Sequence, residues 1–167
     1  MAYHGTSKSR SNKQEKEVAE DLEGRIVIAS GALDDKGDVR AGEFLVECKT
    51  TSNTYYPFRS ETWNKVYDEA KKIGLCPMMC IEMQNRNRVI REQYAILRAA
   101  DFDYYRTKNG AVDFPNFNVL VMKKQVRIYG RAHNERYKNI HSPEIKGGIL
   151  AMIPWEDFLA IVKEEAK

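Results

Sequence analysis

The feature that most constrains the fold is the segment Phe44-Leu-Val-Glu-Cys-Lys49, an apolar strand pattern that carries two opposite charges. Side chains of an extended strand alternate between its two faces, so Glu47 and Lys49 lie on the same face. Burying a charge is costly unless the charge is paired, hydrated or bound to a metal ion. The segment therefore predicts a central strand that carries either an ion pair or a site of chemistry.

A second carboxylate is expected beside this strand. The Ala41-Gly42 turn predicts a hairpin that joins a short strand beginning at Asp38 to a longer strand over residues 43–51. In that hairpin Asp38 lies next to Glu47, and the two carboxylates offer hard oxygen ligands suited to Mg²⁺ or Mn²⁺. Such an ion polarises a phosphoryl oxygen and activates water, while Lys49 orients the water or offsets charge on a phosphate. The alternative is a structural Glu47–Lys49 ion pair on an edge strand, with Asp38 as a turn residue.

An amphipathic helix is expected before this hairpin. Ser11 and Gln14 have the spacing of a capping box, which predicts that the helix begins at residue 11. The apolar face of this helix is predicted to contain Glu15, Val18, Ala19 and Leu22. Because Glu15 lies on that face, we expect it to approach the same pocket as an outer carboxylate. Residues 1–10 are expected to form a flexible basic arm.

The rest of the chain predicts an α/β fold in which helices cover a mixed sheet. The aromatic segment before residue 60 is expected to be a loop, and Ser60 is expected to cap a helix that ends at Gly74. We also expect strands at 25–29, 77–83, 93–97 and 149–153, a hairpin of 118–122 with 126–129, a polar loop at 130–147 and a helix at 155–166.

Positive charge is concentrated in one part of the chain. The whole chain has a net charge of only +3, but residues 86–138 contain twelve Lys and Arg against five Asp and Glu, a net charge of +7. The remaining residues carry a net charge of −4. A basic cluster of this kind is typical of proteins that bind a polyanion, although a solvated charged face is the alternative explanation.

Several classes of protein are excluded or disfavoured by composition. No apolar run approaches the ~20 residues that a membrane-spanning helix needs, and no secretory leader is recognisable. Three cysteines without a CxxC motif fit a reducing compartment and no zinc site. We therefore expect a cytoplasmic protein without a membrane partner.

The motif residues together resemble the PD-(D/E)xK nuclease superfamily, and within it the archaeal-type Holliday junction resolvases and their phage-encoded relatives. The resemblance rests on Glu15 seven residues before Leu22, on Ser30-Gly31, on Gly37-Asp38 and on Glu47-Cys48-Lys49, and it spans roughly residues 8–84. It implies a restriction-endonuclease-like mixed sheet flanked by helices, with an added basic hairpin and loop region. Gly37 departs from the usual proline of the motif, and residues 85–148 have no counterpart in the family pattern.

The resemblance also implies roles for individual residues. Asp38 and Glu47 are then the metal ligands, Lys49 and Glu15 complete the catalytic set, and Ser30 helps to place the scissile phosphate. We expect further contacts to nucleic acid from Lys8, Arg10, Lys13, Lys36 and Arg59, although the basic arm can equally be a solubilising tail.

The sequence thus predicts a Mg²⁺- or Mn²⁺-dependent endonuclease that cuts branched DNA, with a four-way junction as the expected substrate and a homodimer as the expected assembly. The alternatives are another nuclease of the superfamily, of restriction, repair or single-strand type, and a non-catalytic DNA-binding subunit. The chain is expected to form one nuclease domain. Its parts are the arm (1–10), a catalytic core (11–84), a basic extension (85–148), and a closing strand with the C-terminal helix (149–167).

Overall fold

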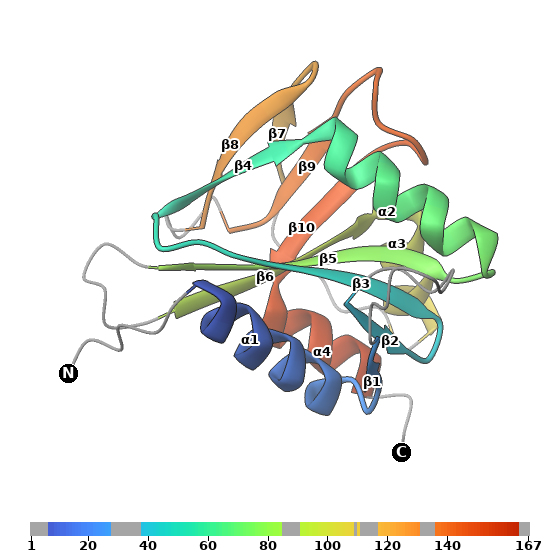
Figure 1. Ribbon diagram of the computed structural model, residues 1–167. Coiled ribbons are helices and arrows are strands. Elements are labelled where there is room, and N and C mark those ends of the chain that lie inside the picture. Colours follow the sequence, from blue (N-terminus) through green and yellow to red (C-terminus); the bar gives the residue numbers. More distant parts are fainter. Residues whose placement is uncertain are drawn as a thin grey trace.

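The computed structural model describes residues 7–27, 38–84, 91–108, 110, 117–130 and 136–163 of the 167-residue chain. In these segments the expected α/β architecture is confirmed: helices surround a mixed sheet of eight strands, and two further strands form a separate ribbon (Figure 1). The helices are α1 (Ser7–Asp21), α2 (Ser60–Lys72), α3 (Ala99–Lys108) and α4 (Trp155–Lys163). None of the described helices is long and apolar enough to cross a membrane.

The eight-stranded sheet draws its strands from both halves of the chain. Its order is β1-β2-β3-β5-β6-β10-β9-β7, and only the pairs β3–β5 and β7–β9 are parallel. The strands are β1 (Arg25–Ile26), β2 (Val39–Ala41), β3 (Phe44–Thr50), β5 (Cys76–Gln84), β6 (Arg91–Arg98), β7 (Asn118–Val121), β9 (Lys138–His141) and β10 (Leu150–Pro154). The strand β6 lies between β5 and β10, so the segment 85–148 contributes to the centre of the sheet.

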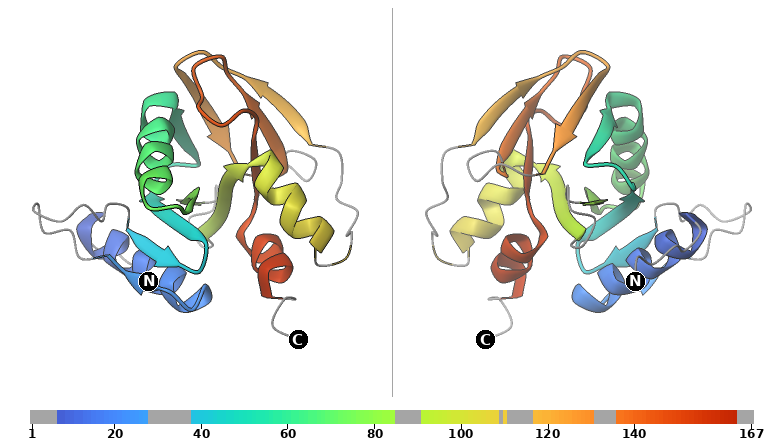
Figure 2. Two further views of the ribbon diagram at one scale, coloured as in Figure 1. Left: turned by 90° about the vertical axis from the view of Figure 1, so that its right-hand side faces the viewer. Right: turned by 90° about the vertical axis from the view of Figure 1, so that its left-hand side faces the viewer.

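The two faces of the sheet are covered by different elements. The helices α1, α3 and α4 pack on one face, where Val18, Phe102 and Phe158 join Val46 in one apolar cluster. The helix α2 packs on the other face together with the ribbon of β4 (Tyr55–Arg59) and β8 (Gln125–Tyr129). The strands β7, β8 and β9 gather at the end of the molecule remote from α1 and α4 (Figure 2).

The N-terminal helix begins earlier than its capping box predicts. Helix α1 starts at Ser7, so the expectation of a flexible arm through residue 10 is wrong for residues 7–10. Ser11 lies one turn inside the helix, and its Oγ donates a hydrogen bond to Glu15 Oε1 at 3.3 Å rather than capping an end. The capping-box pattern involves only four residues. It therefore does not prevent the residues that precede it from joining the same helix.

The helix α2 follows its expected pattern except at its first residue. Trp63, Val66 and Ala70 are buried, and Gly74 adopts a positive φ of 71° just beyond the end of the helix. Arg59, not Ser60, is the N-cap residue, and no side chain caps the helix. The Ser60 Oγ instead donates a hydrogen bond to the carbonyl of Lys124 at 3.3 Å, because the start of α2 is packed against the turn before β8.

The expected aromatic loop before α2 is a strand. Residues 55–59 form β4, which pairs antiparallel with β8 and places Pro57 opposite Arg127. Proline in this segment favoured a loop, yet β4 has a single neighbouring strand among the described residues, and an edge strand tolerates a missing N–H donor.

The expected hairpin of residues 118–122 and 126–129 is also wrong. The strand β7 pairs parallel with β9, and β8 pairs with β4 instead of with β7. The predicted polar loop at 130–147 accordingly contains the strand β9 over Lys138–His141. Local alternation of apolar residues identifies a strand, but long-range packing decides which partner it meets.

Candidate functional site

The hairpin of β2 and β3 fixes the position of Asp38. Its register pairs Val39 with Val46, and Gly42 in the turn has a positive φ of 54°. The backbone N–H of Asp38 donates to the carbonyl of Val46 at 3.0 Å, which extends the ladder by one residue. The carboxylate Oδ2 of Asp38 accepts the backbone N–H of Cys48 at 2.7 Å. These two bonds hold the side chain beside the middle of β3.

Glu47 and Lys49 form the ion pair that alternation along β3 predicts. Lys49 Nζ lies 2.9 Å from Glu47 Oε1, and their side chains are 38% and 20% exposed, respectively. Burial lowers the pKa of Lys49, but its hydrogen bond with Glu47 and the negative charge of that carboxylate outweigh burial, so the pKa is raised. Lys49 is therefore a protonated ammonium group at neutral pH, which favours charge stabilisation over proton abstraction.

Glu15 reaches this cluster from α1. Burial first, and then the negative charges of Glu47 and Glu15, raise the pKa of Asp38 to about 6, against the opposing effects of the Cys48 N–H and Lys49. The structure therefore brings together four residues from three elements, namely Glu15, Asp38, Glu47 and Lys49. Three carboxylates beside one ammonium group leave an excess of negative charge that attracts a cation.

The donor set fits a hard divalent cation held by few protein ligands. Among the described residues, no three or more His, Cys, Asp and Glu side chains form a ready-made metal centre. After burial, the negative charge of Glu47 is the next largest cause of the raised pKa of Asp38, and a bound cation would relieve the repulsion between these two carboxylates. Mg²⁺ is commonly held by one or two carboxylates and keeps several of its waters, so two carboxylates are a sufficient protein contribution.

Sequence reasoning missed one buried residue beneath the site. Gln14 is fully buried on α1, and its Nε2 donates hydrogen bonds to the carbonyls of Lys49 and Cys80, each at 3.0 Å. These bonds attach α1 to β3 and β5 directly under Lys49. The signal was present in the sequence, since Gln14 lies four residues before Val18 and so shares its buried face.

A second residue that was not expected at the site is Tyr56. It lies half-buried on β4, where its pKa is raised first by burial and is also affected by the charges of Lys49 and Glu47. The aromatic segment 55–59 therefore borders the cluster as a strand, although it was expected to be a loop.

The expected nucleic-acid contacts are only partly placed. Arg59 is exposed at the end of β4, and its charge acts on Tyr56. Arg10 is half-buried on α1, while Lys13 is exposed and lies 3.7 Å from Glu17. Ser30 and Lys36 lie outside the described residues, and Lys8 is described only as part of the α1 backbone. The described members of this set therefore lie on two elements, Arg59 on β4 and Arg10 and Lys13 on α1.

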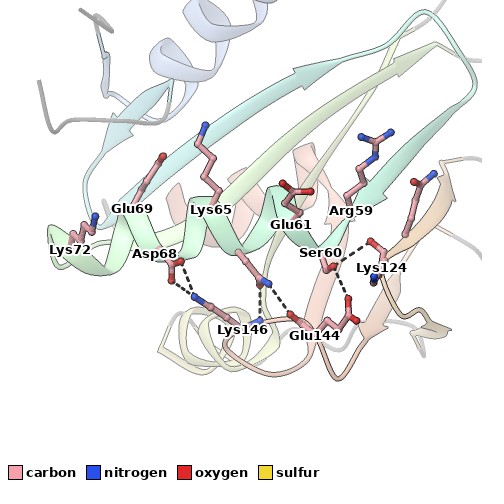
Figure 3. Close-up of a pocket in the computed structure, with 12 residues that line it drawn as sticks. Arg59, Ser60, Glu61, Lys65, Asp68, Glu69, Lys72, Lys124, Glu144 and Lys146 are labelled. Carbon is pink, nitrogen blue, oxygen red and sulfur yellow. Dashed lines mark hydrogen bonds and ion pairs between the residues drawn. The ribbon is translucent and has the colours of Figure 1, made fainter. Parts of the chain in front are cut away.

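A groove on the described surface does not contain the carboxylate cluster. It has a volume of about 890 Å³ and runs along α2 beside the segment 142–148 (Figure 3). Its walls carry both signs of charge, and Lys146 pairs with Asp68 at 2.8 Å across it. Of the expected site residues only Arg59 borders the groove. The carboxylate cluster on the β2–β3 hairpin is therefore the stronger candidate for chemistry.

No protein-family model matches the chain, and no curated protein has a significantly similar sequence.

Proposed function

We propose that this protein is a metal-dependent DNA endonuclease of the PD-(D/E)xK type. The observation that carries the proposal is the convergence of Glu15, Asp38, Glu47 and Lys49, from α1, the start of β2 and β3, into one half-buried cluster. Two acidic residues and a lysine on a strand hairpin supply a ligand set and a fixed positive charge, the combination that hydrolysis of a phosphodiester requires.

Each residue of the cluster has a definite task in this mechanism. When bound by Asp38 and Glu47, a divalent ion supplies Lewis-acid activation of the phosphodiester and of the attacking water. The hydrogen bond from the Cys48 N–H orients Asp38 for this purpose. The ammonium group of Lys49 stabilises the negative charge that develops on the phosphate, and Glu47 holds it in position. Glu15 adds negative charge at the outer side of the site.

The proposed substrate is branched DNA, with a four-way junction as the specific case. A junction contains two symmetric strands to be cut, so the proposed enzyme acts as a homodimer with one site per protomer. The concentration of positive charge in residues 86–138 supports a polyanionic partner.

The decisive experiment is a cleavage assay on a panel of labelled DNAs: a four-way junction, a splayed fork, a linear duplex and a single strand, each with Mg²⁺ or with EDTA. We expect wild-type protein to cut the junction preferentially and only with metal. Asp38→Asn and Lys49→Ala should each lower the rate at least about 100-fold, because the first weakens the binding of the metal ion and the second removes the positive charge aimed at the reacting phosphate. Lys163→Ala, an exposed lysine at the end of α4, serves as the matched control and should cut normally.

The other outcomes identify the alternatives. Preference for another DNA in the panel would keep the nuclease and reject the junction resolvase. Binding of DNA without cleavage beyond the level of the Asp38→Asn variant would indicate a non-catalytic DNA-binding subunit.

A further inference from the structure

The ribbon of β4 and β8 has two chemically distinct faces. Alternation along its strands turns Phe58 and Ile128 inward, and both are fully buried in the core. The alternate residues of each strand face outward. They are Tyr55, Pro57 and Arg59 on β4, which lie opposite Tyr129, Arg127 and Gln125 on β8. We call these six residues the outer ribbon face. The two strands come from parts of the chain about seventy residues apart, so this face is not visible in the sequence.

Aromatic rings on the outer ribbon face are already arranged beside each other. The rings of Tyr55 and Tyr129 have centroids 5.7 Å apart, and Tyr129 is 45% exposed. The guanidinium carbon of Arg127 lies 4.6 Å from the centroid of the Tyr55 ring. The planes of the two rings are inclined at 46°, so the exposed ring of Tyr129 provides the flat surface on which a planar group can stack, with Tyr55 and Arg127 beside it.

The charge of the ribbon is uniformly positive. Neither β4 nor β8 contains an acidic residue, while Arg59, Arg127 and the preceding Lys123 and Lys124 are all exposed. At its Arg59 end, with Lys124, the ribbon borders the groove along α2, where Glu61 and Glu144 carry the opposite charge. An exposed surface that combines aromatic rings with positive charge is complementary to nucleotides, which offer a planar base and an anionic phosphate.

The ribbon also places this face next to the candidate active site. Tyr56 lies between Tyr55 and Pro57 on β4 but points to the inner side, where the charges of Lys49 and Glu47 act on it. The outer ribbon face and the carboxylate cluster therefore lie on opposite sides of β4, and only this strand separates a nucleotide bound on that face from the cluster.

We propose that the outer ribbon face binds unpaired nucleotides of the DNA substrate, with a base stacked on Tyr129 beside Tyr55 and its phosphate held by Arg127 and Arg59. This inference rests on the proposed nuclease function and deepens it, because it assigns unpaired bases as a feature of the substrate. Bases inside a duplex are stacked on each other, so a stacking surface selects single strands and the opened bases of a branch point.

The test is a binding titration without metal, in EDTA, so that no cleavage occurs. The probes are a labelled 15-nucleotide single-stranded DNA, a single-stranded RNA of the same sequence, a 15-base-pair DNA duplex and a splayed DNA fork with single-stranded arms. Tyr129→Leu should weaken binding of the single strand and the fork about tenfold, and leave the duplex within about twofold, because stacking on one ring is lost. Tyr129→Phe keeps the ring and should bind as wild type.

Controls separate this effect from loss of folding. Tyr104→Leu removes an exposed tyrosine on α3, which packs on the opposite face of the sheet, and should bind as wild type. Thermal unfolding of each variant confirms that the fold is intact. If Tyr129→Leu is unstable, Arg127→Ala provides the second variant, with the same expected preference for loss on the single strand.

The proposal is overturned if Tyr129→Leu and Arg127→Ala bind the single strand as wild type, if they lose duplex binding equally, or if wild type prefers RNA of the same sequence. If these variants bind normally while wild-type protein still cuts DNA with metal, the ribbon proposal fails and the nuclease stands. If wild-type protein binds the single strand through Tyr129 but never cuts, the nuclease fails and the binding face stands.

Discussion

At the residue scale, the candidate site depends on a side chain that performs no chemistry. Gln14 is fully buried and spans from α1 to the carbonyls of Lys49 and Cys80. The two hydrogen bonds that its Nε2 donates compensate for part of the hydration that this side chain loses, whereas its Oε1 is buried without a hydrogen-bond partner. The position of the catalytic strand relative to α1 is therefore set by polar contacts as well as by apolar packing.

This role predicts that Gln14→Leu destabilises the protein by about 1–3 kcal/mol, because the substitution keeps the bulk of the side chain but removes its donor from two buried carbonyls. The free energy of unfolding is measured by urea denaturation. Lys13→Ala, an exposed neighbour on the same helix, is the control and should change stability by less than about 0.5 kcal/mol. Equal stability of Gln14→Leu and wild type would contradict the assignment.

Asp38 predicts an unusual dependence of stability on pH in the metal-free protein. Its pKa is about 6 in the folded protein against an ordinary value of 3.8, so the folded state binds the proton more tightly than the unfolded chain does. The resulting stabilisation is fully present below pH 3.8 and is lost as the pH rises through 6.

Asp38→Asn should remove this dependence, because the amide stays neutral and its oxygen can still accept the Cys48 N–H. At pH 7.5 in EDTA we expect the variant to be more stable than wild type by about 1–2 kcal/mol, allowing for partial solvent screening of the carboxylate. At pH 4 the two proteins should have equal stability. Urea denaturation at both pH values checks this, and a variant that is less stable at pH 7.5 would refute it.

At the element scale, the segment 142–148 is tightly attached to α2. Asn64 donates to the carbonyl of Glu144 at 2.8 Å and accepts from the N–H of Lys146 at 2.9 Å, and the indole N–H of Trp63 donates to the Lys146 carbonyl at 3.0 Å. The segment then passes through Gly147 and Gly148, both with φ of 88°. This positive φ is a conformation that other residues rarely adopt.

The two glycines form a matched pair for a stability prediction. A Cβ on Gly148 meets nothing within 4 Å, whereas a Cβ on Gly147 comes within 2.7 Å of the Tyr67 ring and 2.8 Å of Arg98. Gly148→Ala should therefore cost about 1–2 kcal/mol from backbone strain alone. Gly147→Ala should cost about 1 kcal/mol more, because the Tyr67 ring must also move. Urea denaturation measures both, and the reverse order of stability would show that the segment packs differently.

Elements whose turn residues and apolar spacing all lie within a short stretch of the chain were predictable from the sequence. The β2–β3 hairpin and the helix α2 follow from a turn and from apolar spacing, and both are present. The ribbon was not predictable, because β4 contains a proline and its partner β8 lies far along the chain. The pairing of β7 with β9 failed for the same reason, since a local pattern does not specify a distant partner.

At the scale of the whole molecule, the same distinction separates the parts of the candidate site. Asp38, Glu47 and Lys49 share one hairpin, so local alternation was enough to group them. Glu15 joins them only because α1 packs on the sheet, and Tyr56 only because β4 crosses the sheet to reach α2. The sequence therefore predicted Glu15 only as an outer carboxylate and did not predict Tyr56, because tertiary packing places both residues at the candidate site.

The site joins α1, β2 and β3, so cation binding should stabilise the molecule as a whole. In 5 mM Mn²⁺ at pH 7.5 we expect the melting temperature of wild-type protein to rise by several degrees relative to EDTA, since an ion at 100 times its Kd contributes about 2.7 kcal/mol. Glu47→Gln and Asp38→Asn should abolish the shift, while Glu61→Gln, an acidic residue in the first turn of α2, should keep it.

Lys49→Ala separates metal binding from catalysis. Removing the ammonium group takes away a positive charge that lies 2.9 Å from Glu47 and competes with the cation for that carboxylate. The variant should therefore show a metal-induced shift at least as large as that of wild type, although it no longer cuts DNA. A shift lost in Lys49→Ala as well as in Glu47→Gln would mean that the ion pair itself organises the site. A shift retained in Glu47→Gln and Asp38→Asn would mean that the cation binds elsewhere, and the proposed ligand pair would have to be abandoned.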